Sequence, residues 1–269
     1  MKASITILSF NRRLYLEKTL EALLDSLTDR HEVEIILVDN GSEDDSPQLI
    51  REWLQQGIID KALLFGTNQG ISKGFNSGFA LSHPQAKFLI KLDCDIVIHH
   101  RGWLEEMEQI FEDHHQIGLL MLFQENHPTM KDCARTQLGQ RTFISLNEII
   151  VGSACFTIPR KTIDAIGYFF EDHDYLLFYD DIDYYIRLEM IGKEAYYLLS
   201  HTSSYQEHLD ASFYEEYDKS KDPLYARMNV FHKQLNSLYR EGVFPTKRFY
   251  ARMEELAKIA LNHALIELP

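Results

Sequence analysis

The 269-residue sequence is poor in cysteine, in positive charge and in long apolar runs. Its three cysteines are an odd number without a CxxC pair, which argues against a disulfide framework and a zinc ribbon and favours a reducing compartment. The longest apolar runs, such as residues 117–123, fall well short of the roughly 20 residues that span a bilayer. The first residues also lack the apolar core and cleavage site of a signal peptide. We therefore expect a soluble, cytoplasmic protein without a transmembrane segment.

Positive charge is scarce because 27 Lys and Arg stand against 41 Asp and Glu, for a net charge of −14. A nucleic-acid binder needs a surface that neutralises phosphates, so this balance argues against nucleic acid as the main partner. The acidity suits a protein that holds an anionic ligand through a divalent metal ion. The composition is otherwise that of a globular protein, with 45% hydrophobic and 25% charged residues.

Apolar strands alternate with amphipathic helices along the first hundred residues. The helices show apolar residues at helical spacing, and the strands are short buried runs. The predicted strands are residues 4–8, 34–38, 61–65 and 88–92. This alternation predicts an α/β fold with a doubly wound, mainly parallel central sheet.

The pattern loosens in the second part of the chain. Residues 103–113 read as a helix, and residues 117–123 and 150–158 read as strands. The polar stretch at residues 124–148 is predicted to be a long loop with little regular structure.

No linker rich in Pro, Gly or Ser divides the sequence, so residues 1–212 are expected to form one catalytic domain. Residues 213–269 read as a helical C-terminal extension. The apolar stripe on its last helix is expected to pack on the core. A homodimer contact or adsorption at the inner face of a membrane are the alternatives for this stripe.

Polar residues follow each of the four N-terminal strands, where ligands bind in a doubly wound sheet. Asp93 and Asp95 are the sharpest feature among them. Residues i and i+2 of extended backbone point to the same side, so the two carboxylates could converge on one hard cation. The alternative is an ordinary turn or helix cap. The other polar residues at these ends include Ser9, Asn11, Asp39 and Asn68.

Asp39 follows the second strand and opens the sequence Asp-Asn-Gly-Ser. An ionised carboxylate only accepts hydrogen bonds, so Asp39 could read an N–H donor of uracil, thymine or guanine. The same sequence also favours an Asx-turn, and both interpretations can hold together.

Residues 66–78 are rich in glycine but match neither the dinucleotide-binding fingerprint nor the P-loop. These glycines are expected to let a helix pack closely on the sheet. Lys73 within this stretch would either reach a phosphate or lie solvated at the surface.

A second acidic cluster lies at residues 180–187, YDDIDYYIR from Tyr179. If it opens a helix, Asp183 and Arg187 form an i,i+4 pair with a structural role. Asp181 points elsewhere, and a carboxylate at a helix N-terminus stays ionised, as a general base must be. The alternative is the acidic bias common at helix starts. His201 and His208 follow the next predicted strand and are candidates for a nitrogen ligand to the metal.

Taken in order, these segments resemble the inverting family 2 glycosyltransferases of GT-A fold. The resemblance extends over residues 4–212 and rests on several short motifs. They are SITILSFNR (4–12), EIILVDNGS (34–42), NQGISKGFNSG (68–78), LDCDI (92–96), VGSACF (151–156), IGYF (166–169) and DDIDYYIR (180–187). Asp180 stands where the family usually has Glu, and residues 124–148 match nothing in it.

The resemblance implies a donor half at residues 1–98 and an acceptor half at residues 99–212. The donor would be a nucleotide-diphosphate sugar, with UDP favoured and dTDP or GDP as alternatives, held with Mn²⁺ or Mg²⁺. The donor-binding residues would be Ser9, Asn11, Asp39, Asn68, Lys73, Asp93 and Arg227.

The resemblance also assigns the metal ligands and the base. Asp39 would contact the nucleobase, Asp93 the ribose or the metal, and Asp95 the metal. HLDAS (208–212) fits the family's late metal histidine better than HTSS (201–204), which favours His208. Asp181 would deprotonate the acceptor hydroxyl.

The acceptor would be a carbohydrate, a lipid-linked sugar or a protein, in the synthesis of a bacterial surface glycan or glycoconjugate. Two other functions compete with this one. A catalytically inactive nucleotide- or sugar-binding protein would keep the same fold. A sugar-1-phosphate nucleotidylyltransferase would carry a glycine-rich basic loop after the first strand, whereas residues 9–18 have arginines without glycines.

Overall fold

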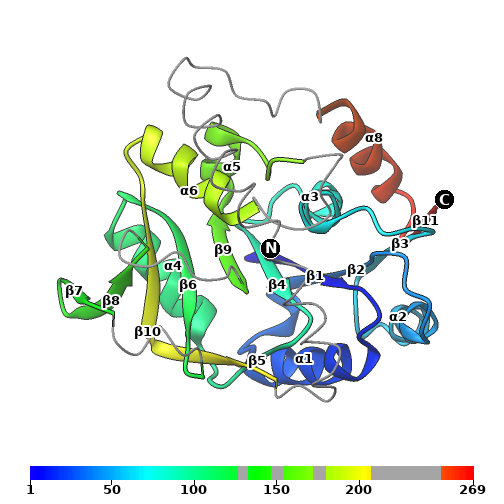
Figure 1. Ribbon diagram of the computed structural model, residues 1–269, viewed down its shortest axis with the longest axis horizontal. Coiled ribbons are helices and arrows are strands. Elements are labelled where there is room, and N and C mark those ends of the chain that lie inside the picture. Colours follow the sequence, from blue (N-terminus) through cyan, green and yellow to red (C-terminus); the bar gives the residue numbers. More distant parts are fainter. Residues whose placement is uncertain (127–132, 147–153, 172–179, 207–249) are drawn as a thin grey trace, which may run out of the picture.

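One mixed sheet runs through the whole molecule (Figure 1). The computed structural model describes all residues except 127–132, 147–153, 172–179 and 207–249. The eleven strands follow the order β11-β3-β2-β1-β4-β9-β6-β10-β8-β7, and β5 pairs with β10. Their bounds are β1 Ala3–Ser9, β2 Val33–Asp39, β3 Lys61–Phe65, β4 Phe88–Asp93, β5 Ile96–Ile98, β6 Ile117–Gln124, β7 Arg135–Leu138, β8 Arg141–Ser145, β9 Cys155–Pro159, β10 Glu194–Tyr205 and β11 Leu265–Leu268.

Helices cover both faces of this sheet (Figure 1). Residues of α1, α2 and α4 belong to one core cluster, and residues of α3, α5, α6 and α8 belong to a second cluster on the other face. The helices are α1 Arg13–Ser26, α2 Ser46–Gln55, α3 Ile71–Leu81, α4 Trp103–Asp113, α5 Arg160–Ile166, α6 Asp180–Met190 and α8 Tyr250–Ala260, with a short 3₁₀ turn at Arg30–Glu32.

The parallel, doubly wound arrangement predicted from the sequence is confirmed for the first half of the sheet. Strands β3, β2, β1 and β4 are parallel neighbours, and α1, α2 and α3 connect them. The second half is mixed, because β9 lies antiparallel to both β4 and β6 while β10 runs parallel to β6.

The prediction of an irregular loop at residues 124–148 is wrong. Strands β7 and β8 form an antiparallel hairpin in this stretch, turning at Gly139 with a φ of +60°. Exposed and half-buried residues alternate along β7, so the strand has no apolar run by which to recognise it. The predicted strand at residues 150–158 is observed as β9, within the part of the chain that the structure describes.

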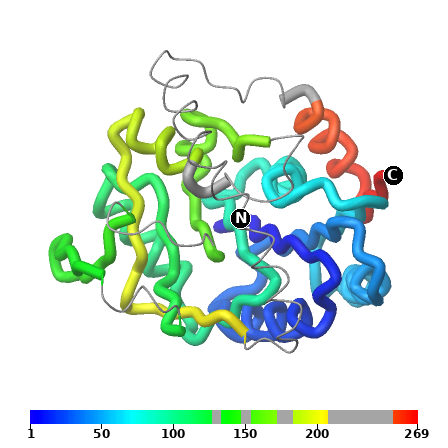
Figure 2. The backbone as a smooth tube through the Cα atoms, in the orientation of Figure 1, coloured from blue at the N-terminus to red at the C-terminus, as the bar shows by residue number. Residues whose placement is uncertain are grey.

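The C-terminal extension, predicted to be helical at residues 213–269, contains α8 but ends in a strand, which the prediction missed. Helix α8 packs against α3, as the expected core packing requires (Figure 2), but β11 follows it and adds a parallel edge strand to β3. The main chain supports this pairing, since Gly66 N donates to Leu268 O at 2.7 Å and Ala62 N donates to Ala264 O at 2.7 Å. The C-terminal end of the chain thus belongs to the sheet.

The glycines of α3 bring this helix into contact with β1. A Cβ on Gly78 would lie 2.2 Å from Thr6 Cγ2, and a Cβ on Gly74 would lie 2.5 Å from Leu8 Cδ1. No larger side chain fits at either position without moving its neighbour. The expected close packing of this glycine-rich segment on the sheet is confirmed.

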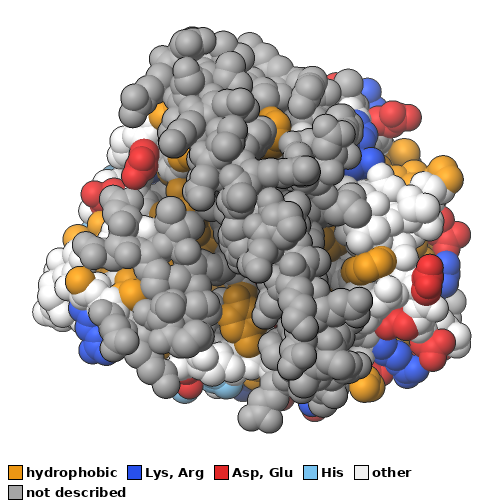
Figure 3. Space-filling view, viewed as in Figure 1, with side chains coloured by type: hydrophobic (Ala, Val, Ile, Leu, Met, Phe, Trp, Pro, Cys, Tyr) orange, Lys and Arg blue, Asp and Glu red, His pale blue; other side chains and the backbone are white. Residues whose placement is uncertain are grey.

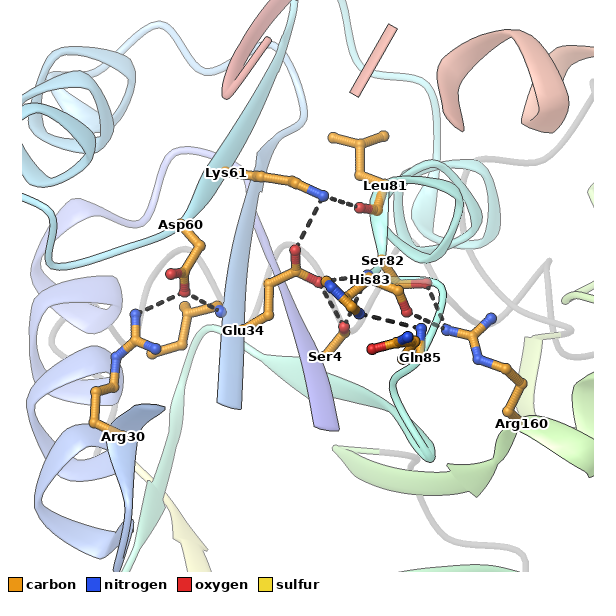
Figure 4. A network of polar contacts seen from close by, with 11 residues as sticks. Ser4, Arg30, Glu34, Asp60, Lys61, Leu81, Ser82, His83, Gln85 and Arg160 are labelled. Carbon is orange, nitrogen blue, oxygen red and sulfur yellow. Dashed lines mark hydrogen bonds and ion pairs between the residues drawn. The ribbon is translucent and has the colours of Figure 1, made fainter. Parts of the chain in front are cut away.

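A buried carboxylate, Glu34, holds together the amino-terminal ends of the parallel strands (Figure 4). Glu34 is 4% exposed and accepts hydrogen bonds from Ser4 Oγ at 2.5 Å and from the backbone N of His83 at 2.7 Å. Lys61 Nζ lies 3.0 Å from its other oxygen and also donates to Leu81 O at 2.6 Å. These contacts tie the end of α3 to the starts of β1, β2 and β3, and they leave the carboxyl ends of the strands for a ligand.

Candidate functional site

The pairing register brings the predicted donor-site residues to one edge of the sheet. Ser9 is paired with Asp39, and Leu8 is paired with Asp93. All three strands are parallel, so their carboxyl ends meet there. This edge is the candidate site.

Asp39 uses one carboxylate oxygen for the local turn and leaves the other unsatisfied. Its Oδ2 accepts from the backbone N of Gly41 at 3.1 Å and of Ser42 at 2.9 Å, which is the expected Asx-turn. Its Oδ1 is buried and has no hydrogen-bond partner among the described residues. Burial raises the pKa of Asp39, although the hydrogen bonds from Ser42 and Gly41 oppose this shift. A buried acceptor without a partner is costly, and an N–H donor of a ligand would satisfy it.

The loops around Asp39 are held together by side-chain amides. Asn11 has a φ of +53°, and its Oδ1 accepts from Glu43 N at 2.7 Å. The Asn68 Oδ1 accepts from Asn40 Nδ2 at 2.9 Å and from Gly70 N at 2.8 Å. These two asparagines therefore shape the loops that surround the strand ends. The Oγ of Ser9 is buried and without a partner in the described part of the chain.

Asp93 ends β4, and Asp95 follows it by two residues. The intervening Cys94 is buried, and its carbonyl accepts from Thr19 Oγ1 at 2.8 Å, while the side chains of Asp93 and Asp95 are 34% and 17% exposed. Burial, followed by the charges of Asp93 and Asp95, raises the pKa of Tyr205 at the end of β10. Both carboxylates thus act on one phenol, and their convergence on a cation stays a prediction.

Each of the two carboxylates has a cation beside it. Arg12 Nη1 donates to Asp95 Oδ2 at 2.7 Å, and Lys91 Nζ lies 3.2 Å from Asp93 Oδ1. Over the described residues, no group of three or more His, Cys, Asp and Glu is arranged to hold a metal ion. Protein ligands from these residues would therefore be limited to the two carboxylates, which are hard oxygen donors.

The two candidate histidines differ in what the structure says of them. His201 lies within β10, where its Nδ1 is 2.6 Å from Glu106 Oε2 and its Nε2 is 3.2 Å from Arg101 O. His208 and Arg227 lie outside the described residues. The last described residue before His208 is Gln206, whose backbone N donates to Asp95 O at 2.8 Å.

Lys73 lies beside the C-terminal helix. Its Nζ donates to Gln69 Oε1, and burial together with the nearby charge of Arg252 lowers its pKa. Arg252 forms a two-pronged pair with Glu171, which is 3% exposed and also accepts from Asn76 Nδ2 at 2.8 Å. The structure thus places Lys73 next to a cation and an anion on other elements.

The second acidic cluster forms the start of α6. The Asp183–Arg187 pair is fully buried, and Arg187 also donates to the carbonyls of Ile166 and Tyr168. Its structural role is confirmed. Asp181 lies in the first turn of α6, and its side chain is outside the described residues.

Sequence reasoning missed Arg12, Lys91 and Tyr205 as parts of this site. Lys91 carried a readable signal, since a lysine inside the apolar run FLIKL needs a buried anion. Arg12 and Tyr205 carried none, because their proximity to Asp95 depends on strand pairing between distant segments.

The profile of glycosyl transferase family 2 matches residues 4–184, which is more than half of the chain. The chain belongs to glycosyl transferase family 2. A curated family relative, an uncharacterized glycosyltransferase of Nostoc sp. (strain PCC 7120), is 30% identical over 121 residues, which are 45% of this chain and 36% of that protein. None of the three cysteines of this family 2 chain forms a disulfide, and its described part contains no helix long and apolar enough to cross a membrane.

Solved structures share the GT-A fold of this chain. The mannosyltransferase PcManGT of Pyrobaculum calidifontis, in complex with GDP-Man and Mn²⁺, aligns with a TM-score of 0.65 and 14% identity over 97% of this chain and 74% of that one. S. aureus TarS aligns with a TM-score of 0.61 and 19% identity over 80% of this chain and 38% of TarS. A shorter TarS, residues 1–349 with UDP-GlcNAc, gives a TM-score of 0.60 and 18% identity over 78% and 60% of the two chains. The chain therefore spans little more than a third of the Nostoc relative and of TarS.

Proposed function

We propose that this family 2 chain is an inverting, metal-dependent glycosyltransferase that moves a sugar from a nucleotide-diphosphate sugar to an acceptor hydroxyl. The observation that carries the proposal is the buried Oδ1 of Asp39, which has no hydrogen-bond partner among the described residues, at the strand edge that also holds Asp93 and Asp95. One acceptor for a base N–H and two carboxylates for a cation are the groups that a nucleoside diphosphate with its metal ion requires.

The base would lie against the end of β1. Phe10 is 41% exposed at this point, next to Ser9 with its unpaired Oγ. An exposed aromatic ring offers a face for stacking, while Asp39 accepts from the base edge. An acceptor at this position suits uracil, thymine or guanine, and we favour UDP. Asn11, Asn68, Lys73 and Arg227 would complete the donor site.

Asp93 and Asp95 would hold Mn²⁺ or Mg²⁺, with His208 as the nitrogen ligand. The hard oxygen donors fit such an ion. The ring nitrogens of His201 face Glu106 and the carbonyl of Arg101, which favours His208 as the nitrogen ligand. When bound, the ion stabilises the charge of the departing diphosphate. The complex of PcManGT with GDP-Man and Mn²⁺ supports this use of a metal.

Asp181 would take the proton of the acceptor hydroxyl as the hydroxyl attacks the anomeric carbon in line. The bond from this carbon to the diphosphate oxygen breaks in the same step, so the configuration inverts. A carboxylate in the first turn of α6 is kept ionised by the helix dipole, as a general base requires. The acceptor would be a sugar, a lipid-linked sugar or a protein, in bacterial surface-glycan or glycoconjugate synthesis near the inner face of the membrane.

Thermal unfolding with UDP, GDP, dTDP or CMP, each with Mn²⁺ or with EDTA, tests donor binding. A ligand at 100 times its Kd stabilises the fold by about 2.7 kcal/mol, or about 5–10 °C in Tm. We expect this shift with UDP and Mn²⁺ and its loss in EDTA. No shift with any nucleotide would contradict the proposal.

Asp181→Asn separates an enzyme from an inactive binding protein with the same fold. We expect the variant to lose release of UDP from a UDP-sugar while its Kd for UDP changes less than about twofold. Asp180→Asn, one position earlier on α6, is the matched control and should retain turnover. A wild-type protein that binds donor without releasing UDP under any acceptor condition would favour the inactive binding protein.

A further inference from the structure

Each of the two carboxylates of the proposed metal site lies beside a cation, and the two cations occupy different places in the fold. Lys91 is 2% exposed in the middle of β4, and its Nζ lies 4.8 Å from the ring centroid of Phe75 and 5.5 Å from that of Phe156. This packing fixes its ammonium beside Asp93. The ammonium of Lys91 is therefore held at one position in the site.

Arg12 is placed differently, because it belongs to the connection between β1 and α1. It is the N-cap residue of α1, and it follows Asn11, whose backbone is left-handed. Its guanidinium carbon lies 5.4 Å from the ring centroid of Tyr15, and its side chain is 19% exposed. The guanidinium can therefore leave Asp95 by rotation of its side chain and still remain over an aromatic face.

A guanidinium at 2.7 Å from Asp95 Oδ2 fills the place that a cation ligated by this oxygen needs. Both side chains are mostly buried, so solvent screens their attraction only in part. An arriving metal ion must break this pair and meets the repulsion of a second positive charge. A diphosphate would relieve both effects, because its oxygens match the planar fork of arginine.

We propose that Arg12 acts as a displaceable counter-ion of Asp95, which weakens binding of the metal ion alone and makes it depend on the nucleotide diphosphate. This inference rests on the proposed metal site at Asp93 and Asp95. It assigns Arg12 a positioning role that the sequence did not indicate. Metal and nucleotide would then bind with positive coupling, each raising the affinity of the other by the same factor.

The test is a titration of the full chain with Mn²⁺, followed by electron paramagnetic resonance, without and with saturating UDP. Without UDP, we expect Arg12→Gln to bind Mn²⁺ about fivefold or more tightly than the wild type, since a partly buried charge-assisted pair no longer competes. With UDP the difference should shrink, so the coupling factor falls in the variant. Arg12→Lys keeps the charge without the fork and should lie between the two.

Arg13→Gln is the matched control. Arg13 carries the same charge one residue later but pairs with Asp45 at 3.2 Å and Glu17 at 3.4 Å, away from Asp95. Its Mn²⁺ affinity should stay within about twofold of the wild type, because an exposed charge is screened. A similar gain in Arg13→Gln would reduce the effect to net charge and overturn the proposal.

Asp95→Asn distinguishes failure of the inference from failure of the site. If Asp95→Asn weakens Mn²⁺ binding but Arg12→Gln and Arg12→Lys match the wild type, the metal site holds and the role of Arg12 is overturned. If neither the wild type nor the Arg12 variants bind Mn²⁺ even with UDP, the metal-dependent function itself is contradicted. Unchanged near-ultraviolet circular dichroism verifies that each variant is folded.

Discussion

Asp39 and Asp44 lie five residues apart, and the fold treats their charges in opposite ways. Burial raises the pKa of Asp39, so its ionised form is less favourable in the folded chain than in the unfolded one. For Asp44, hydrogen bonds from Ser46 and Arg13 outweigh the effect of burial and lower the pKa. Asp39 therefore costs stability at neutral pH, whereas Asp44 contributes to it. A residue that destabilises the fold is best explained by a ligand that it serves.

We expect Asp39→Asn to be as stable as the wild type or about 1 kcal/mol more stable at pH 7, while it loses UDP binding. The asparagine Oδ1 can keep the turn contacts with Gly41 and Ser42, and no buried charge remains. The stability of the wild type should fall relative to the variant as pH rises above 3.8, the ordinary value for Asp, up to the raised pKa of Asp39. Urea unfolding at several pH values measures this difference.

Asp44→Asn is the control with the opposite sign. Its lowered pKa means that ionised Asp44 stabilises the fold above its unfolded value, and this contribution disappears as pH falls through the folded value. The variant should therefore be less stable at pH 7 and should retain UDP binding. A loss of stability in Asp39→Asn as large as that in Asp44→Asn would show that Asp39 has only a structural role.

At the scale of single residues, the sequence indicated the acidic residues of the candidate site but not the side chains that lie beside them. Asp39, Asp93 and Asp95 could be found because they directly follow recognisable strands. Arg12 and Tyr205 could not, because they approach Asp95 from segments that are far away in the sequence. The orphaned Oδ1 of Asp39 is likewise a property of burial that only the structure reveals.

Among the elements, α8 is joined to the rest of the fold by an ion pair as well as by apolar packing. Met253 and Leu256 enter the core cluster that covers α3, and Arg252 reaches Glu171 with two hydrogen bonds. Glu171 also accepts a hydrogen bond from Asn76 Nδ2 of α3. Helix α8 is thus linked to α3 through one buried carboxylate.

We expect Arg252→Met to destabilise the fold by about 2–4 kcal/mol, because Glu171 would be left buried without its cation. Adding Glu171→Gln should recover part of this loss, since the uncompensated charge is then removed. Urea unfolding of the two single variants and the double variant gives the coupling energy as a double-mutant cycle. Additive effects of the two substitutions would show that Arg252 and Glu171 do not stabilise the fold through their ion pair.

Elements with strong apolar periodicity were predictable, and edge strands were not. The four strands at the centre of the first half and the glycine-rich α3 follow from runs and spacing in the sequence. β7 and β11 lie at opposite ends of the strand order, where one side of each strand has no neighbour in the described sheet. Such strands bury few side chains, so their sequences carry little pattern.

At the scale of the whole molecule, ion pairs and apolar cores join parts of the chain that are far apart in sequence. Arg51 of α2 pairs with Glu267 of β11 at 2.6 Å, and acidic and basic side chains lie side by side at the right-hand edge of Figure 3. The excess of acid thus does not gather into one patch at this edge. Each core cluster also contains residues from both residues 1–98 and residues 99–212, joined by the pairing of β4 with β9.

This shared core predicts that the two halves of the fold, residues 1–98 and residues 99–212, unfold together. The two tryptophans report on the two halves, since Trp53 lies in α2 and Trp103 is buried in α4. In Trp53→Phe and in Trp103→Phe, the fluorescence midpoint in urea should coincide with that of far-ultraviolet circular dichroism. Leu198→Ala truncates a fully buried side chain of β10, within residues 99–212, and should cost about 2–5 kcal/mol. If the halves form one cooperative unit, this substitution lowers the midpoint reported by Trp53 as much as that reported by Trp103. A Trp53 signal that does not respond to Leu198→Ala would instead show that residues 1–98 unfold on their own.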